Sequence, residues 1–304
     1  MTTAIVVEEL QKAYGPIRAA DGISFEVQQG EIFGMVGPNG AGKTTTIECI
    51  EGLRKADSGQ ISLLGKDPRK QRVDLAERIG IQLQESALPS RLRVVEAMTL
   101  FRSFYSIQAD VDELLDRLGL QEKRSTPFSK LSGGQKRRLF IALALINRPD
   151  VVFLDELTTG LDPQARRAMW DLVRQIREQG RTVFLTTHFM EEAERLCDRV
   201  AILDRGCIVA LDTPEELIRS LGKEKRLLFK ADGQDPRPVL ADVPGVVQVE
   251  HSAGRTIVHG GGDHFASNVM NALEEAGINF NDFRTQQPTL DDVFLAMTGR
   301  EMRE

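Results

Sequence analysis

Four residues in the segment GPNGAGKTT, residues 37–45, have the types and spacing of a phosphate-binding loop. Gly37, Gly42, Lys43 and Thr44 fit the pattern G-x-x-x-x-G-K-[ST], between an apolar run and a helical stretch. Backbone N–H groups at a helix start attract phosphate, the lysine neutralises β- and γ-phosphate charge, and the hydroxyl holds Mg²⁺. We therefore predict a nucleoside triphosphate site formed by Gly37, Pro38, Asn39, Gly40, Ala41, Gly42, Lys43, Thr44 and Thr45.

Two adjacent carboxylates, Asp155 and Glu156, end the apolar run VVFLDE. Acidic residues commonly end strands, so this pair alone carries little information. In a chain with a phosphate-binding loop, the aspartate is placed to hold Mg²⁺ through water and the glutamate to polarise an attacking water. The pair therefore predicts hydrolysis of the bound nucleotide.

A second glycine-bearing helix start occurs in LSGGQ, residues 131–135. Ser132 and Gln135 have the spacing of a capping box, which explains those two residues. It does not explain Gly133 and Gly134, because each glycine weakens the first turn by roughly 1 kcal/mol. Glycines allow a large group to approach the backbone, so this segment predicts a second phosphate contact. One phosphate-binding loop cannot use both segments on the same nucleotide.

Positioning these residues requires a framework, and apolar runs alternate with helical stretches along the chain. This alternation predicts a mostly parallel sheet covered on both faces. The first 30 residues contain short strands, and residues 93–130 are helical, with Val94, Val95, Met98, Phe101 and Tyr105 at helix spacing. The expected buried strands are 31–36, 151–156 and 182–188, and the expected helices are 44–53, a segment ending at Gly119, 162–180 and 189–198.

The pattern breaks near residue 221, where LGKEKR and then DGQDPRPVLADVPG have the composition of linkers. We expect a domain at 1–220 that holds the site and a small α+β domain at 221–304. Its last helix, after Thr289, has one apolar face that packs either in its own small core or in a regulatory or dimer-stabilising contact. The other elements expected there are strands at 246–250, 255–259 and 278–285 and a helix at 263–276, and the apolar face contains Leu290, Val293, Phe294 and Met297.

The composition limits the class of protein. The chain has 304 residues, a net charge of −6 and a pI near 5.5, which disfavours a broad nucleic-acid footprint. No run approaches the length of a membrane span, and the N-terminus does not resemble a signal peptide. Cys49, Cys197 and Cys207 have neither disulfide nor zinc-site spacing, so we expect buried, reduced thiols. These features predict a cytoplasmic protein. If it acts at a membrane, another chain must supply the membrane-spanning helices.

LSGGQ followed by VVFLDE resembles the signature of the ATP-binding cassette (ABC) ATPases, over about residues 3–220. The resemblance implies a P-loop α/β fold with a parallel sheet core, an antiparallel β subdomain and a helical subdomain at about 86–147. It also implies that two copies pack head to tail. Ser132, Gly133 and Gly134 of one copy, between Leu131 and Gln135, would then cover the γ-phosphate of ATP on the other.

Four further residues match family positions. The resemblance implies that Tyr14 stacks on adenine, Gln84 senses Mg²⁺ and the γ-phosphate, Asp162 crosses the dimer interface, and His188 contacts the γ-phosphate. Taken singly they have ordinary roles, as a half-buried strand residue, a loop amide, a helix cap and a surface histidine. Together with Lys43 they complete the expected ATP and Mg²⁺ site, in which Thr44, Gln84 and Asp155 hold the metal.

Two segments depart from the family pattern. Leu157 replaces a usual proline, which would loosen the turn after Glu156. LRVVE, residues 92–96, replaces a usual Leu-Thr-Val, which puts the capping of the following helix in question. Neither departure changes a residue expected to act in hydrolysis.

The whole chain, including PTLDDVFLAMTGR near the C-terminus, resembles the daunorubicin-resistance type of exporter ATPase. This resemblance implies a peripheral ATPase on the cytoplasmic face of the membrane that powers a separate permease, which contacts the transported compound. The helical subdomain and the segment around Gln84 would contact that permease. The alternatives are a soluble ABC ATPase acting on nucleic acid or a ribosome, disfavoured by the acidic pI, and a catalytically quiet interaction module, disfavoured by the intact hydrolytic residues.

Overall fold

The computed structural model describes residues 2–82, 87–221, 225–231, 235–252 and 254–299. The chain divides into two compact units, one ending at Pro214 and the other beginning at Glu215. This division falls at the start of the helix α8, Pro214–Ser220.

The main sheet of the first unit is built from β3 (Ile32–Val36), β5 (Ile79–Gln82), β6 (Val151–Asp155), β7 (Thr182–Thr187), β8 (Arg199–Asp204) and β9 (Cys207–Asp212). Its order is β5-β6-β7-β3-β8-β9, and only the β8–β9 pair is antiparallel. Every residue of β3, β6 and β7 is buried, which confirms the three strands predicted from apolar runs. Because these three strands are parallel neighbours, the segments that follow them meet at one edge of the sheet.

An antiparallel sheet with the order β2-β1-β4 belongs to the same unit. Its strands are β1 (Thr3–Tyr14), β2 (Ile17–Gln28) and β4 (Ser58–Leu63). The ring of Phe25 in β2 stacks on Phe33 in β3, with centroids 5.1 Å apart, and Phe33 lies 5.5 Å from Phe184 in β7. These aromatic contacts fix the antiparallel sheet against the main sheet.

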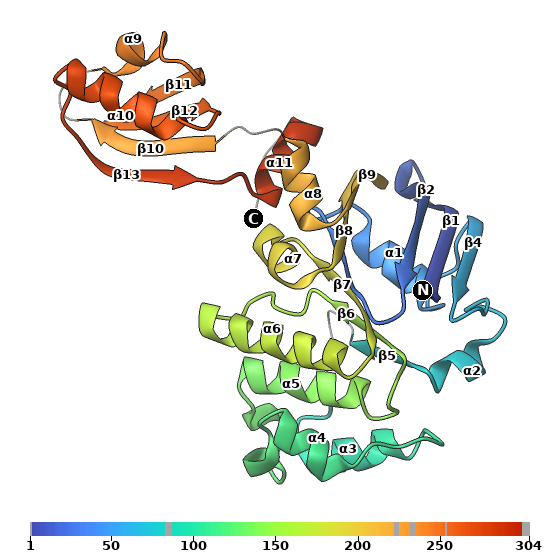
Figure 1. The fold of residues 1–304 in the computed structure, drawn as a ribbon. Helices are drawn as coiled ribbons and strands as arrows, with labels where there is room; N and C mark the ends of the chain where they lie inside the picture. Colours follow the sequence, from blue (N-terminus) through green and yellow to red (C-terminus); the bar gives the residue numbers. More distant parts are fainter. Residues whose placement is uncertain (1, 83–86, 222–224, 232–234, 253, 300–304) are drawn as a thin grey trace. The chain divides into compact units, whose positions relative to one another are not determined.

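The site-bearing helices of the main sheet are α1 (Lys43–Ile50), α6 (Pro163–Glu178) and α7 (Met190–Leu196). A short helix, α2 (Arg72–Ala76), precedes β5. A helical region follows β5 in the chain and lies beside α6 in Figure 1; it contains α3 (Val94–Arg102), α4 (Val111–Arg117) and α5 (Gly133–Ala144).

Two expectations about the helical region are corrected. Tyr105 lies beyond the end of α3, although its spacing fitted the helix. The start of α3 is capped without the usual threonine, because the Glu96 carboxylate accepts a hydrogen bond of 2.9 Å from the Arg93 backbone N–H. LRVVE therefore keeps one half of a capping box.

The second unit contains β10 (Lys225–Ala231), α9 (Arg237–Leu240), β11 (Val246–Ser252), β12 (Arg255–Gly260), α10 (Phe265–Glu275), β13 (Phe280–Gln286) and α11 (Leu290–Thr298). Its sheet is antiparallel, in the order β11-β12-β10-β13. α9 lies in a stretch that we interpreted as a linker, and β10 begins in one such stretch and continues to the residue before the next. Both elements contribute buried residues to this unit's core, including Phe229 and Leu240. Met297 is 48% exposed, so the predicted apolar face of α11 is reduced to Leu290, Val293 and Phe294.

The cysteines only partly follow the prediction. Cys49 and Cys197 are buried free thiols, whereas Cys207 is exposed at the start of β9. Among the described residues no helix is long and apolar enough to cross a bilayer.

Candidate active site

The phosphate-binding loop connects β3 to α1, and its backbone requires glycine at the start of the helix. Gly42 has φ = 107°, and a Cβ there would lie 1.9 Å from the Ala19 carbonyl oxygen. The Gly42 carbonyl oxygen accepts hydrogen bonds of 2.9 Å from both the backbone N–H and the hydroxyl of Thr46. The first turn of α1 is thereby fixed directly behind the loop.

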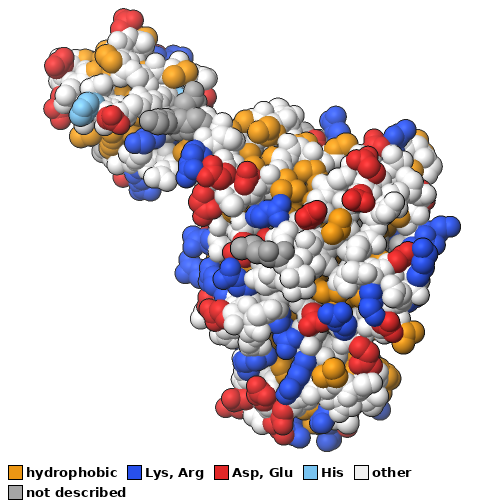
Figure 2. All heavy atoms as spheres, turned by 45° about the vertical axis from the view of Figure 1, so that its right-hand side comes forward, with side chains coloured by type: hydrophobic (Ala, Val, Ile, Leu, Met, Phe, Trp, Pro, Cys, Tyr) orange, Lys and Arg blue, Asp and Glu red, His pale blue; other side chains and the backbone are white. Residues whose placement is uncertain are grey.

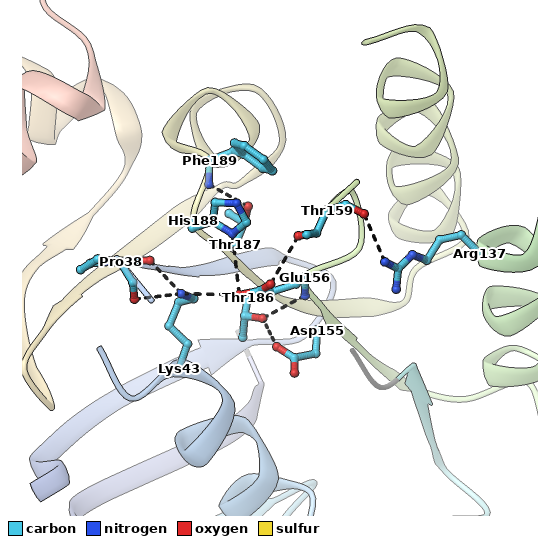
Figure 3. Close-up of polar contacts among 11 residues, drawn as sticks. Pro38, Lys43, Arg137, Asp155, Glu156, Thr159, Thr186, Thr187, His188 and Phe189 are labelled. Atoms are coloured by element: carbon cyan, nitrogen blue, oxygen red, sulfur yellow. Dashed lines mark hydrogen bonds and ion pairs between the residues drawn. The ribbon is translucent and has the colours of Figure 1, made fainter. Parts of the chain in front are cut away.

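The Lys43 side chain folds back over this loop and is only 4% exposed. Its ammonium donates to the carbonyl oxygens of Gly37 and Pro38 at 2.8 and 3.2 Å (Figure 3). Burial lowers the pKa of Lys43, and the carboxylates of Glu156 and Asp155 oppose that shift. A cation thus lies where the loop would receive phosphate.

Asp155 ends β6 and is held from the next strand, because the Thr186 hydroxyl donates to its Oδ1. Burial raises the pKa of Asp155, as does the neighbouring Glu156, while hydrogen bonds from Thr186 and Thr44 and the charge of Lys43 lower it. Thr44 and Asp155 therefore bring a hydroxyl and a carboxylate oxygen together. Such oxygen donors fit Mg²⁺, the metal that these two residues would hold.

Glu156 has a buried carboxylate, 6% exposed, and a left-handed backbone with φ = 47°. Its N–H donates to the backbone oxygen and the hydroxyl of Thr186 at 3.1 and 3.2 Å, which holds this unusual conformation. Its Oε1 lies 3.8 Å from the Lys43 ammonium and 3.7 Å from Nδ1 of His188 (Figure 3). The carboxylate thus lies between the lysine of the loop and a titratable ring.

His188 follows β7 and precedes α7. The Phe189 N–H donates to the Thr187 hydroxyl at 3.0 Å, and the His188 ring lies 4.0 Å from the Phe189 ring. These contacts hold the segment that places His188 beside Glu156. The structure therefore brings together Lys43, the pair Asp155 and Glu156, and His188, which come from three segments far apart in the sequence.

The LSGGQ segment begins α5 with the predicted capping box. The Ser132 hydroxyl accepts from the Gln135 N–H at 3.3 Å, and the Gln135 side chain accepts from the Ser132 N–H at 3.0 Å. Among the described residues, no atom outside the helix's own first turns lies within 4 Å of a Cβ added at Gly133 or Gly134. Packing against the described part of the chain therefore does not explain why both residues are glycine.

Asp162 and Tyr14 were also predicted as site residues, and their contacts lie outside the group formed by Lys43, Glu156 and His188. Asp162 is exposed and caps α6, accepting from the N–H groups of Gln164 and Ala165 at 3.0 and 2.8 Å. Tyr14 is 41% exposed, and its ring lies near the charged ends of Lys12 and Arg54 at 5.5 and 5.4 Å. Gln84 lies outside the described residues.

The turn after Glu156 is closed despite Leu157 in place of proline. The Thr159 N–H donates to the Glu156 oxygen at 3.3 Å, the Leu161 N–H donates to the Thr158 oxygen at 3.1 Å, and Leu157 is buried. Hydrogen bonds and burial thus restrain the segment that the missing proline was expected to loosen.

Sequence reasoning missed the residues that support the carboxylates, namely Thr186, Thr159 and Arg137. Thr186 lies in the predicted strand 182–188, two residues before the predicted site residue His188. Its position in the sequence could therefore have indicated a place near the site. Arg137 donates to the Thr159 carbonyl oxygen across more than 20 residues of sequence, and nothing in the local pattern indicates that contact.

Comparison with known proteins identifies the family. A family model described as ABC transporter matches residues 20–159. The Nod factor export ATP-binding protein I of Paraburkholderia xenovorans (strain LB400) is 40% identical over 310 residues, which cover 99% of each chain. This chain belongs to the ATP-binding subunits of ABC transporters, which are ATPases.

Further comparisons place this ABC ATPase in the same family. The daunorubicin resistance ATP-binding protein DrrA3 of Streptomyces coeruleorubidus is 36% identical, with 99% of this chain and 98% of that protein covered. The solved structure of cbiO1 from Clostridium perfringens, part of the ABC transporter complex cbiONQ, has a TM-score of 0.65 and 29% identity, and the match covers 73% of this chain and 95% of that one. The predicted fold class and ATPase activity are confirmed.

Proposed function

We propose that this ABC ATPase powers the export of drugs or other hydrophobic or amphipathic compounds through a separate membrane permease, from the cytoplasmic face of the membrane. Two relatives that match nearly the whole chain have names of export or drug-resistance proteins. On the face shown in Figure 2, basic and acidic side chains are interspersed over the first unit without a continuous basic stripe, which supports transport over work on nucleic acid.

The observation that carries the hydrolytic role is the position of Glu156 between Lys43 and His188. In the proposed mechanism the loop from Gly37 to Thr45 holds the phosphates of ATP, and the ammonium of Lys43 turns from loop carbonyl oxygens to phosphate oxygens. Thr44 and Asp155, with Gln84, would hold Mg²⁺, which neutralises charge on the β- and γ-phosphates when bound. Glu156 accepts the proton of the attacking water, and His188 orients the γ-phosphate.

A head-to-tail dimer explains the open glycines of LSGGQ. Because no other element of the described chain occupies the space beside Gly133 and Gly134, a phosphate on a second copy can approach their backbone N–H groups. In the dimer Asp162 crosses the interface, and Tyr14 stacks on the adenine of its own copy. Closure of the dimer around ATP would drive the permease between its states.

A groove of about 500 Å³ provides a surface for the permease. Its lining is mostly apolar, with Ile79 of β5, Phe101 of α3 and Phe140 of α5, and it also includes Glu51. Glu51 is 4% exposed, and neither of its carboxylate oxygens has a hydrogen-bond partner in the part of the chain that the structure describes. An unpaired buried carboxyl is costly, so the proposed occupant is a permease helix that fills the apolar groove and places a hydrogen-bonding side chain on Glu51.

The proposal is tested by turnover and efflux of matched variants. Glu156→Gln should lower the Mg-ATPase rate of the purified chain about 10²- to 10⁴-fold while ATP still binds, because the amide cannot accept the proton. Lys43→Ala should weaken ATP binding, measured by fluorescent-nucleotide titration, because it removes the charge in the loop. In cells lacking the chain, wild type but neither variant should lower accumulation of daunorubicin or rhodamine 6G.

Two results would count against parts of this proposal. Near-wild-type turnover in Glu156→Gln would remove Glu156 as the base. Normal ATPase activity that is stimulated by DNA or RNA, with no effect on dye accumulation, would favour the nucleic-acid alternative over export.

A further inference from the structure

Arg137 connects the LSGGQ helix to the segment that follows the catalytic strand. It lies on the second turn of α5, and its guanidinium donates to the Thr159 carbonyl oxygen at 3.4 Å (Figure 3). α5 begins with the two open glycines, and Thr159 lies between β6 and α6. One side chain therefore joins two elements that separately contribute to the site.

Thr159 in turn binds Glu156 in two places. Its N–H donates to the Glu156 backbone oxygen at 3.3 Å, and its hydroxyl donates to Glu156 Oε2 at 3.3 Å. The backbone contact closes a turn directly after the left-handed residue, and the hydroxyl contact fixes one carboxylate oxygen. The other oxygen, Oε1, is the one nearest Lys43 and His188.

Charge supports the same connection. Burial lowers the pKa of Arg137, and Glu156 and Asp155 oppose that shift by favouring the charged guanidinium. The guanidinium therefore lies within electrostatic range of both site carboxylates. Its link to the Glu156 carboxylate is made by the two hydrogen bonds of Thr159.

We propose that Arg137 and Thr159 are positioning residues that set the orientation of the Glu156 carboxylate and couple it to α5. Movement of the start of α5 shifts Arg137, then the Thr159 backbone, and then the hydroxyl that holds Glu156. In the head-to-tail dimer, a point that rests on the proposed function, LSGGQ contact with the nucleotide of one site would thereby adjust the glutamate of the other site.

The first test separates the Thr159 hydroxyl from its bulk, using the purified full-length chain. Thr159→Val keeps the shape but removes the donor, and should lower kcat for Mg-ATP about 10-fold with KM within about twofold, because only the orientation of the base changes. Thr159→Ser keeps the donor and should restore kcat to within about threefold of wild type. An unchanged kcat in Thr159→Val, or no rescue by serine, would overturn the role of the hydroxyl.

The second test uses a matched pair on α5. Arg137→Met should lower kcat for Mg-ATP with KM within about twofold, because Thr159 loses the guanidinium contact on its carbonyl oxygen. Lys136→Met removes the same charge one residue away, where the ammonium lies over the Phe128 ring, and should change neither kcat nor KM. Equal effects of the two variants would overturn the role of Arg137.

A double-mutant comparison distinguishes this inference from the assignment of the base. If Thr159 and Arg137 act through Glu156, Thr159→Val and Arg137→Met should change the residual rate of Glu156→Gln by less than about twofold. Full additive losses would overturn the link even if Glu156 is the base. Near-wild-type activity of Glu156→Gln alone would instead contradict the proposed function.

Discussion

Glu156 has a left-handed backbone, which is unfavourable for a residue other than glycine, and it also supplies the proposed catalytic carboxylate. A left-handed backbone at a residue other than glycine costs about 1–3 kcal/mol and persists only where the surroundings enforce it. Here Thr186 binds the Glu156 N–H from β7, and Thr159 binds its backbone oxygen and carboxylate. The strained conformation places the carboxylate between Lys43 and His188, and for this reason we regard it as functional.

Glu51 shows a second conflict, between burial and charge. Burial, with smaller contributions from Asp155 and Glu48, raises the pKa of Glu51 from 4.5 to about 9. A raised pKa means that the folded chain holds a proton which the unfolded chain releases. The resulting stability is fully present below about pH 4.5 and is lost as the pH rises toward 9.

We therefore expect Glu51→Gln to be more stable than wild type at pH 8.5, and the two to converge near pH 5. The free-energy difference should grow by at most about 1.4 kcal/mol per pH unit. Urea unfolding of both proteins at pH 5, 7 and 8.5 measures it. Parallel stability curves for the two proteins would show that Glu51 is ionised in the folded chain.

At the scale of elements, α5 begins with glycines that its own fold does not require. A methyl group at Gly133 or Gly134 would meet no other element of the described chain within 4 Å, so alanine at either position should stabilise the helix by about 0.5–1 kcal/mol. We expect Gly134→Ala to raise the melting temperature of the isolated chain while it lowers ATP turnover, because the new methyl group blocks the approach of a phosphate. Calorimetry measures the melting temperature, and an ATPase assay measures the turnover of the same preparation. Higher stability with full activity would show that the glycine has no partner across an interface.

At the scale of the whole molecule, no other element of the described chain covers the two glycines of LSGGQ, so a second copy could contact them. We expect Glu156→Gln to form a dimer in Mg-ATP but not in Mg-ADP, because slow hydrolysis preserves the γ-phosphate that the second copy would contact. Light scattering gives the mass in each condition, and the double variant with Gly134→Ala is the matched control. A monomer in both nucleotides would indicate that closure needs the permease or a different partner.

The sequence could point to the chemical groups of the proposed site because they lie in short motifs. The loop at 37–45, the carboxylates after 151–154 and the histidine after 182–187 each follow a buried apolar run. Parallel pairing of β3, β6 and β7 then brings these strand ends together. The elements missed in the second unit are α9, which lies in a stretch rich in charge and proline, and β10, which is flanked by two such stretches. Both contain short buried segments that this composition conceals.

The sequence by itself therefore determined the family, the ATPase chemistry and the order of the main elements, because loop geometry and strand burial are local properties. Only the tertiary structure decided how the carboxylates are supported. The left-handed Glu156, the burial of Glu51 without a hydrogen-bond partner among the described residues, and the path from Arg137 through Thr159 depend on packing between elements distant in the chain. Such contacts leave no periodic pattern in the sequence, because they are single side chains whose partners are set by packing.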